Sequence, residues 1–280
     1  MTDYLRPVTV AEAVAARAAH PDWMVLAGGT DLMVNATHKA APPGIVDLWG
    51  CDELRGIVRS ADNIRIGAGT PWLDVLGHAL VQKHVPILAA AAREIGALQI
   101  QARGTIGGNI ATSSPVGDSL PVLLALDAEL ELMSPRGHRF LPYRDFCTGY
   151  RTTALGADEL IVNVAIPIPP AGTRLFWRKV GTRAAQSISK VMAAAAIHLD
   201  AHTITWARFA LGAVADRPIR VPAAEAAAAN QPPTESTARA VAAAVASSIT
   251  PITDVRSSSS YRHEVAQSLL MRFVLNAATS

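Results

Sequence analysis

The chain has 280 residues, of which 50% are hydrophobic and 17% are charged, so it is long enough for two or three packed domains. Its 25 basic and 23 acidic residues nearly balance, and no basic block appears, which argues against a nucleic-acid-binding surface. The two isolated cysteines are too few for an iron–sulfur cluster and form no C-x-x-C pair for zinc, so buried free thiols are expected for Cys51 and Cys147.

The N-terminal residues lack the basic and apolar regions of a signal peptide. The longest apolar runs, such as residues 191–199, are too short to cross a bilayer. We therefore expect a cytoplasmic protein with no membrane insertion.

The first part of the chain alternates between helical and strand-like patterns. The patterns predict a helix at 9–20 with Thr9 as its N-cap, a buried strand at 23–27, a helix from Asp31 and a strand at 44–48. A strand–helix–strand unit of this length suits a small parallel sheet. We expect a small α/β lobe over residues 1–54.

The middle of the chain has half-buried strands that alternate with period two. The patterns predict strands at 64–68, 128–132 and 160–166 and helices at 70–80 and 85–95. We expect an antiparallel sheet with helices over residues 55–172.

The last part combines strands with alanine-rich helices. The patterns predict strands at 175–180, 189–199 and 204–211 and helices at 223–230, 237–248 and 262–278. We expect a C-terminal domain with a three-stranded sheet plus helices over residues 173–280. The predicted fold class is α+β.

A first glycine motif follows the strand at 23–27, where Gly28-Gly29 precede Thr30 and Asp31 at a helix start. Glycines let the backbone approach a ligand closely, and a helix N-terminus favours an anion, so the motif suits a phosphate. It is neither G-x-G-x-x-G nor a P-loop. A tight turn capped by Thr30 or Asp31 is the alternative.

A second motif packs glycines, small hydroxyl residues and one carboxylate into residues 104–118, just before a helix that starts near Pro121. Such a loop is costly in backbone entropy. Two separate glycine motifs suit one long ligand with two phosphates better than two unrelated turns.

Together the motifs resemble those of the FAD-binding medium subunits of the xanthine dehydrogenase and carbon monoxide dehydrogenase family, which are molybdenum hydroxylases. The resemblance covers the whole chain. Weaker landmarks lie at 158–161, 178–183 and 257–262.

The resemblance implies that FAD is the cofactor of this chain and that residues 1–54 and 55–172 form a two-lobed FAD-binding domain. The residues implied to hold its pyrophosphate, through backbone N–H groups and short side chains, are Ala27, Gly28, Gly29, Thr30, Asp31, Leu32, Met33, Thr105, Gly108 and Asn109. Asp118 would accept hydrogen bonds from the sugar of the flavin or from the adenine-linked part. Ile161 would place its backbone at the edge of the isoalloxazine ring, and Lys179 would lie at the pyrimidine end of the ring.

The resemblance also implies a complex, arranged as a dimer of heterotrimers. A large subunit with a molybdenum–pterin cofactor would oxidise a heteroaromatic compound or an aldehyde. A small subunit with two [2Fe–2S] clusters would conduct electrons to the FAD, which would pass them to an external acceptor. No catalytic residue and no metal ligand are expected in this chain. The substrate stays open, and NAD, oxygen, a quinone or a carrier protein remain open as acceptor.

The sequence departs from the family pattern in two places. An arginine of the family pattern is displaced by two positions, to Arg103, so its role is open. Where many relatives have an acidic residue near the flavin, this chain has Ala185, Gln186 and Ser187, which are neutral.

Other arrangements are less favoured. His198 and His202 are four residues apart, but they lie in a β-like stretch with only Asp200 nearby, so a structural role is favoured over a metal site. Two alternatives stay open for function: a stand-alone flavoenzyme of the same superfamily, and an assembly module that has lost the flavin.

Overall fold

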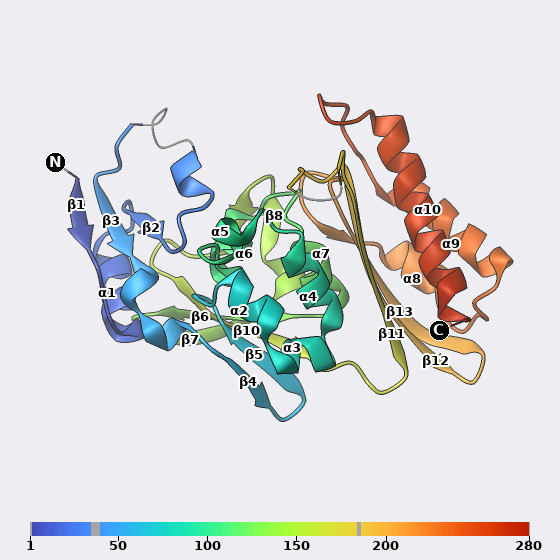
Figure 1. The fold of residues 1–280 in the computed structure, drawn as a ribbon, viewed down its shortest axis with the longest axis horizontal. Coiled ribbons are helices and arrows are strands. Elements are labelled where there is room, and N and C mark those ends of the chain that lie inside the picture. The colour runs from blue at the N-terminus through green and yellow to red at the C-terminus, as the bar shows by residue number, and fades with distance from the viewer. Residues whose placement is uncertain (1, 35–39, 184–185, 280) are drawn as a thin grey trace.

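The computed structural model describes residues 2–34, 40–183 and 186–279, and it confirms the α+β fold class. Three sheets follow one another along the chain, each with its own helices (Figure 1). A small ribbon of β8 (Cys147–Gly149) and β9 (Thr152–Thr153) lies apart from them.

The N-terminal lobe contains a parallel sheet in the order β1-β3-β2. Its elements are β1 (Asp3–Leu5), α1 (Val10–Ala19), β2 (Met24–Leu26), β3 (Gly44–Asp47) and the 3-10 turns η2 (Leu48–Gly50) and η3 (Asp52–Leu54). Thr9 caps α1 as predicted, since its side chain accepts a hydrogen bond from the N–H of Glu12. The helix predicted from Asp31 is a 3-10 turn at residues 32–34; its continuation into 35–39 lies outside the described residues.

The middle sheet is antiparallel in the order β4-β5-β10-β6-β7. Its strands are β4 (Ile57–Ser60), β5 (Asn63–Gly67), β6 (Glu129–Ser134), β7 (Gly137–Pro142) and β10 (Leu160–Pro167). The edge strands β4 and β7 escaped the sequence analysis because they are largely exposed and have no apolar alternation.

Helices connect β5 to β6. They are α2 (Trp72–Gly77), α3 (Ala79–His84), α4 (Pro86–Arg93), α5 (Leu98–Gln101), α6 (Ile106–Thr112) and α7 (Leu120–Ala125), and the 3-10 turn η4 (Tyr143–Asp145) follows β7. The single helix predicted at 70–80 is wrong, because His78 ends α2 and its Nδ1 accepts the N–H of Leu80 to begin α3.

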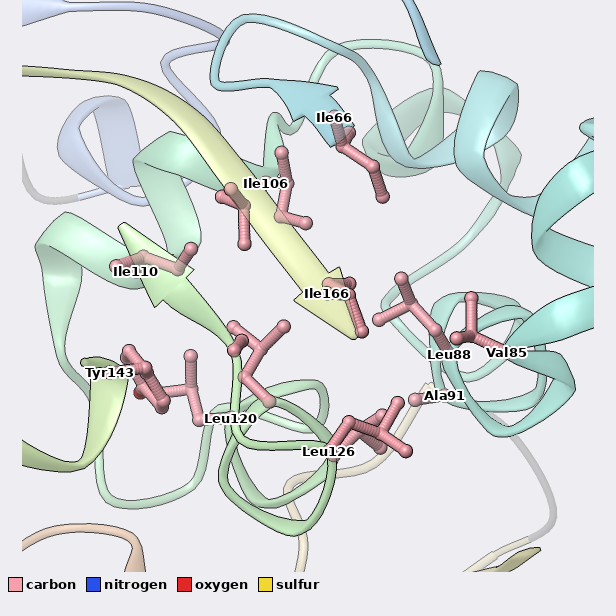
Figure 2. Packing of buried hydrophobic residues seen from close by; sticks show 14 of the residues in the cluster. Ile66, Val85, Leu88, Ala91, Ile106, Ile110, Leu120, Leu126, Tyr143 and Ile166 are labelled. Atoms are coloured by element: carbon pink, nitrogen blue, oxygen red, sulfur yellow. The ribbon is translucent and has the colours of Figure 1, made fainter. Parts of the chain in front are cut away.

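One apolar core joins this sheet to its helices (Figure 2). Ile66 and Ile166 of neighbouring strands lie with Leu88 of α4 and with Ile106 and Ile110 of α6. Burial of each such side chain stabilises the fold by about 1.5–3 kcal/mol. The core therefore fixes α6, and with it the second glycine motif.

The C-terminal sheet is antiparallel with four strands in the order β11-β12-β13-β14, so the predicted three strands are corrected to four. Its elements are β11 (Thr173–Val180), β12 (Val191–Asp200), β13 (Thr203–Gly212), β14 (Ile219–Arg220), α8 (Pro222–Ala228), α9 (Glu235–Ser248) and α10 (Ser259–Ala277). The extra strand has two residues, too few to show a period. Helices α8, α9 and α10 cover one face, whereas α4 and α7 contact the sheet from the other side (Figure 1).

His198 and His202 do not share a strand. His198 lies in β12, where its Nδ1 is 3.1 Å from the hydroxyl of Thr173 and its ring stacks on Trp206. His202 lies in the turn between β12 and β13. This placement supports the structural role.

Lobe 1 shares little apolar surface with the middle sheet. Two small clusters join them, one with Ala13, Val14 and Leu160 buried, the other with Cys51, Leu54 and Val162. Both cysteines of the chain are buried and free, as predicted.

Candidate functional site

A cleft of about 810 Å³ lies where lobe 1, the middle part and the C-terminal sheet meet. All of the predicted cofactor-binding residues line it except Met33, whose side chain is 60% exposed. The residues that line it are Ala27, Gly28, Gly29, Thr30, Asp31, Leu32, Thr105, Gly108, Asn109, Asp118, Ile161 and Lys179. Residues that the sequence places far apart therefore share one cavity.

The first glycine motif forms a turn with its N–H groups unpaired. Gly29 has a φ of +76°, a conformation that favours glycine. The N–H group of Met33 bonds to the carbonyl of Gly29, but those of residues 28–32 have no acceptor in the described part of the chain. Consecutive unpaired N–H groups at a cleft wall are suited to an anion such as a phosphate.

The second glycine motif is a helix rather than a loop. Thr105 is the N-cap of α6, and its hydroxyl accepts the N–H of Gly108 at 3.1 Å. The N–H groups of Ile106, Gly107 and Asn109 bond to the carbonyls of Thr70, Ala68 and Thr105. These three donors are used within the protein, in contrast to the N–H groups of residues 28–32 in the first motif.

Glycines in the second motif permit close packing instead. A Cβ on Gly107 would lie 2.6 Å from the Cβ of Ala68, and one on Gly104 would lie 3.1 Å from the hydroxyl oxygen of Thr30. The two motifs are therefore in contact. Asn109, whose Oδ1 accepts the hydroxyl of Ser119 at 2.7 Å, keeps its Nδ2 without a partner among the described residues.

Three arginines that the sequence analysis did not select also line the cleft: Arg17, Arg55 and Arg151. Burial lowers the pKa of Arg17, which donates to the carbonyls of Pro21 and Trp23 and has a buried Nε without a partner in the described residues. From sequence, Arg17 cannot be told from an arginine that merely offsets a helix dipole.

Arg151 is also part of the cleft wall. It has a φ of +50° and lies 3.4 Å from Asp31. The cleft wall thus carries three arginines, of which Arg151 pairs with Asp31 and Arg55 with Asp52. Guanidinium groups are suited to a phosphorylated ligand.

A buried ion pair lies at the far end of the cleft. Lys179 Nζ is 2.7 Å from Asp118 Oδ2, and the hydroxyl of Ser189 donates to Asp118 Oδ1 at 2.6 Å. Lys179 Nζ also lies 3.3 Å from the carbonyl oxygen of Glu94. Burial raises the pKa of Asp118, while Lys179 and the hydrogen bond from Ser189 act to lower it. No sequence pattern indicated a role for Ser189.

Ile161 lies near the start of β10, buried on the cleft wall. The pairing of β10 with β6 is irregular between Ile161 and Asn163, where the register shifts. Such bulges reposition the backbone beside a site.

Arg103 does not line the cleft. Its guanidinium stacks on the ring of Trp49 at 3.6 Å, and Arg55 stacks on the same ring at 4.5 Å. The displaced arginine therefore holds a wall of the cleft through Trp49, which lines it.

The neutral residues after Arg183 are partly placed. Gln186 and Ser187 line the cleft, and Ser187 donates to the carbonyl of Arg183 at 3.3 Å. Ala185 lies outside the described residues. In the described part of the cleft, no carboxylate replaces the acidic residue of the family pattern at positions 186 and 187.

The arrangement fits FAD. The unpaired N–H groups and arginines suit a pyrophosphate, and the same cleft is lined by a buried ammonium–carboxylate pair that suits the polar end of a flavin ring.

Comparisons with known proteins agree with this geometry. Residues 1–169 match the family described as the FAD binding domain in molybdopterin dehydrogenase, and residues 177–277 match the CO dehydrogenase flavoprotein C-terminal domain. The xanthine dehydrogenase FAD-binding subunit of Escherichia coli O157:H7 is 34% identical over 99% of this chain and 96% of that subunit. The nicotine 6-hydroxylase medium subunit of Paenarthrobacter nicotinovorans is 32% identical over 98% of this chain and 96% of that subunit.

A solved structure shows the same fold. The carbon monoxide dehydrogenase of Hydrogenophaga pseudoflava aligns with a TM-score of 0.94 and 32% identity over 99% of this chain and 97% of that chain. The chain belongs to the family of FAD-binding medium subunits of molybdenum hydroxylases, and it is an oxidoreductase subunit. In the described ranges, no helix is both long and apolar enough to cross a membrane.

Proposed function

We propose that this chain holds FAD in the cleft and connects [2Fe–2S] clusters on a small partner subunit to an external electron acceptor. The observation that carries the proposal is the single cleft that joins the unpaired N–H groups of residues 28–32 to the Lys179–Asp118 pair. Bound FAD would supply the redox group, and the chain would supply binding, orientation and electrostatics.

The pyrophosphate would contact the first glycine motif. Its N–H groups are free to donate, and Arg17, Arg55 and Arg151 would offset the phosphate charge. The α6 segment would support this loop from behind through the contact between Gly104 and Thr30.

The flavin ring would lie between Ile161 and the C-terminal sheet. Lys179 would face the pyrimidine end, as the resemblance implies. Because Asp118 contacts Lys179, the group that Asp118 meets lies next to the ring. This contact favours the sugar beside the ring over the adenine-linked part as the partner of Asp118.

The parts of the chain would share these tasks. We propose residues 1–54 and 55–172 as the two lobes that bind FAD and residues 173–280 as the C-terminal flavoprotein domain. The large partner subunit would carry the molybdenum–pterin cofactor and oxidise a heteroaromatic compound or an aldehyde, within a dimer of heterotrimers. Relatives whose names include nicotine 6-hydroxylase and glyceraldehyde dehydrogenase support these two substrate classes.

The test is an absorption spectrum of the purified chain, followed by chromatography of any chromophore released on denaturation. A two-band flavin spectrum with released FAD and no turnover by the chain alone is expected. Turnover by the chain alone would instead favour a stand-alone flavoenzyme. A colourless protein that cannot be reconstituted with FAD would overturn the proposal in favour of an assembly module.

A further inference from the structure

Ser189 is a buried serine with one well-defined task in the structure. Its side chain is 1% exposed, and its hydroxyl donates to Asp118 Oδ1 at 2.6 Å. The other carboxylate oxygen, Oδ2, binds Lys179 at 2.7 Å. Each oxygen of Asp118 therefore has its own donor, which fixes the rotation of the carboxylate.

The backbone around Ser189 is fixed as well. The N–H of Lys190 donates to the carbonyl of Val180 at 2.8 Å, and the carbonyl of Lys190 accepts Nη1 of the buried Arg262 at 2.6 Å. The hydroxyl of Ser189 is thus held in place by the start of β12 and by α10. Because the position of this hydroxyl is fixed independently of Asp118, the hydroxyl can determine the orientation of the Asp118 carboxylate.

Asp118 meets few other charged or polar groups. Its own carbonyl accepts the indole N–H of Trp177 at 3.3 Å, which anchors its backbone. Glu94 acts to raise the pKa of Asp118 together with burial, whereas Lys179 and Ser189 act to lower it. The charged form of Asp118 therefore depends on two donors, one from each end of the segment that links β11 to β12.

We propose that Ser189 is a positioning residue that holds the Asp118 carboxylate against Lys179 and so sets how much uncompensated positive charge the bound flavin meets. The proposal rests on the proposed function, in which FAD occupies the cleft. The proposal goes beyond that function because the net charge near the flavin would depend on Ser189, which is itself uncharged.

The direction of the effect follows from charge. Without the hydroxyl, Asp118 loses a hydrogen bond to its charged form, and Lys179 is less well compensated. A cation favours the reduced flavin because reduction adds negative charge. The variant S189A should therefore raise the reduction potential of bound FAD.

The experiment measures that potential in the FAD-loaded chain with reference dyes, over a range of pH. We expect S189A to change the ratio of the affinities for oxidised and reduced FAD about tenfold, which is a rise of about 30 mV for a two-electron couple. The bend of the potential–pH curve that reports Asp118 should move to higher pH, because the pKa of this carboxyl loses one of the interactions that lower it.

Controls separate positioning from packing. S134A removes the hydroxyl of another buried serine, in β6, and should leave the potential unchanged. S189T keeps the hydroxyl and should restore the wild-type potential even if the extra methyl group lowers the Tm. In a D118N background, S189A should have no further effect on the potential.

Each outcome decides something. An unchanged potential and unchanged bend in S189A, with only the Tm lowered, would show that Ser189 merely satisfies a buried carboxylate. If D118N fails to bind FAD, the position of the bend in S189A alone decides the matter. If the wild-type chain binds no FAD, the proposed function fails and this inference fails with it.

Discussion

Gly28 lies so close to the backbone of Arg103 that a Cβ at position 28 would be 1.9 Å from the carbonyl oxygen of Arg103. The two glycine motifs of the chain thus depend on the absence of a side chain at one position. This contact holds the turn of the first motif against the segment that leads into α6.

The substitution G28A should therefore separate the two motifs. The clash is with backbone, which cannot rotate away, so we expect the free energy of unfolding to fall by about 2 kcal/mol and FAD binding to be lost. Urea denaturation and the FAD content of the purified protein measure the two effects. G77A is the matched control, because a Cβ on Gly77 would meet no atom within 4 Å. FAD retention by G28A would contradict the expectation.

Removal of Lys179 should leave the buried carboxylate of Asp118 without its cation and lower the free energy of unfolding. In K179M, Asp118 keeps its burial and loses its cation, so we expect a loss of about 3–5 kcal/mol. Burial raises the pKa of Asp118 above its value in the unfolded chain, and loss of Lys179 raises it further. As the pH falls, Asp118 is therefore protonated at a higher pH in the folded state than in the unfolded state.

The destabilisation by K179M should therefore be largest above the folded-state pKa of Asp118 and should shrink as the pH falls through it. Urea denaturation at several pH values measures this. The control is K179M/D118N, which removes both charges and should be more stable than K179M alone. Equal losses at every pH would show that removal of Lys179 does not change the pKa of Asp118 in the folded chain.

Thr105 and Thr9 permit a matched comparison of two helix caps. Each hydroxyl accepts an N–H three residues ahead, that of Gly108 and that of Glu12. We expect T105V and T9V each to lower the free energy of unfolding by about 1 kcal/mol. Only T105V should weaken FAD binding, because Thr105 and α6 line the cleft, whereas Thr9, the N-cap of α1, does not. Fluorescence titration of the apoprotein with FAD tests the difference, and equal affinities in both variants would contradict it.

Arg262 connects the C-terminal helix to the strand that follows Ser189. It is 3% exposed and donates to the carbonyls of Lys190 and Ala213 and to the carboxylate of Asp254. We expect R262M to lower the free energy of unfolding by about 2–4 kcal/mol, because two buried carbonyls lose their donor. Thermal unfolding measures it. The exposed Arg239, paired only with Glu235 four residues earlier, is the control, and R239M should change stability little.

Asp254 predicts an acid dependence of the same region. Burial acts to raise its pKa, but hydrogen bonds from Arg256 and Arg262 outweigh burial and lower the pKa to about 2. The pKa of Asp254 is lower in the folded chain than in the unfolded chain. The stabilisation is therefore present above about pH 4 and is lost as the pH falls through about 2. In R262M the loss should begin at higher pH. Acid titrations of wild-type protein and R262M, followed by circular dichroism, test this order.

The sequence predicted elements whose signals are local. The Thr9 cap and the strand β10 were confirmed, because each depends on neighbouring residues. The edge strands β4 and β7 were missed because an exposed strand needs no apolar period. The two-residue strand β14 was missed because it is defined by its pairing with β13 alone.

The site was predicted unevenly for the same reason. The glycine motifs can be recognised from the sequence. Whether their N–H groups are free or already bonded depends on contacts with Ala68 and Thr70, which lie outside the motifs. Ser189 binds Asp118 across 71 positions of sequence, and no local pattern reports such a contact. The roles given to Ile161 and Lys179 toward FAD stay predictions.

The small apolar contacts between lobe 1 and the middle sheet have a consequence for the chain before it binds its cofactor. Two small apolar clusters hold this boundary together with the contact between Gly28 and Arg103, and the cleft runs along it. A boundary between two parts of a chain can open at a lower free energy than the whole chain unfolds. A ligand that spans it closes it in proportion to its concentration. Without FAD the chain would then open most readily at this boundary, and FAD bound across the cleft would hold lobe 1 against the middle sheet.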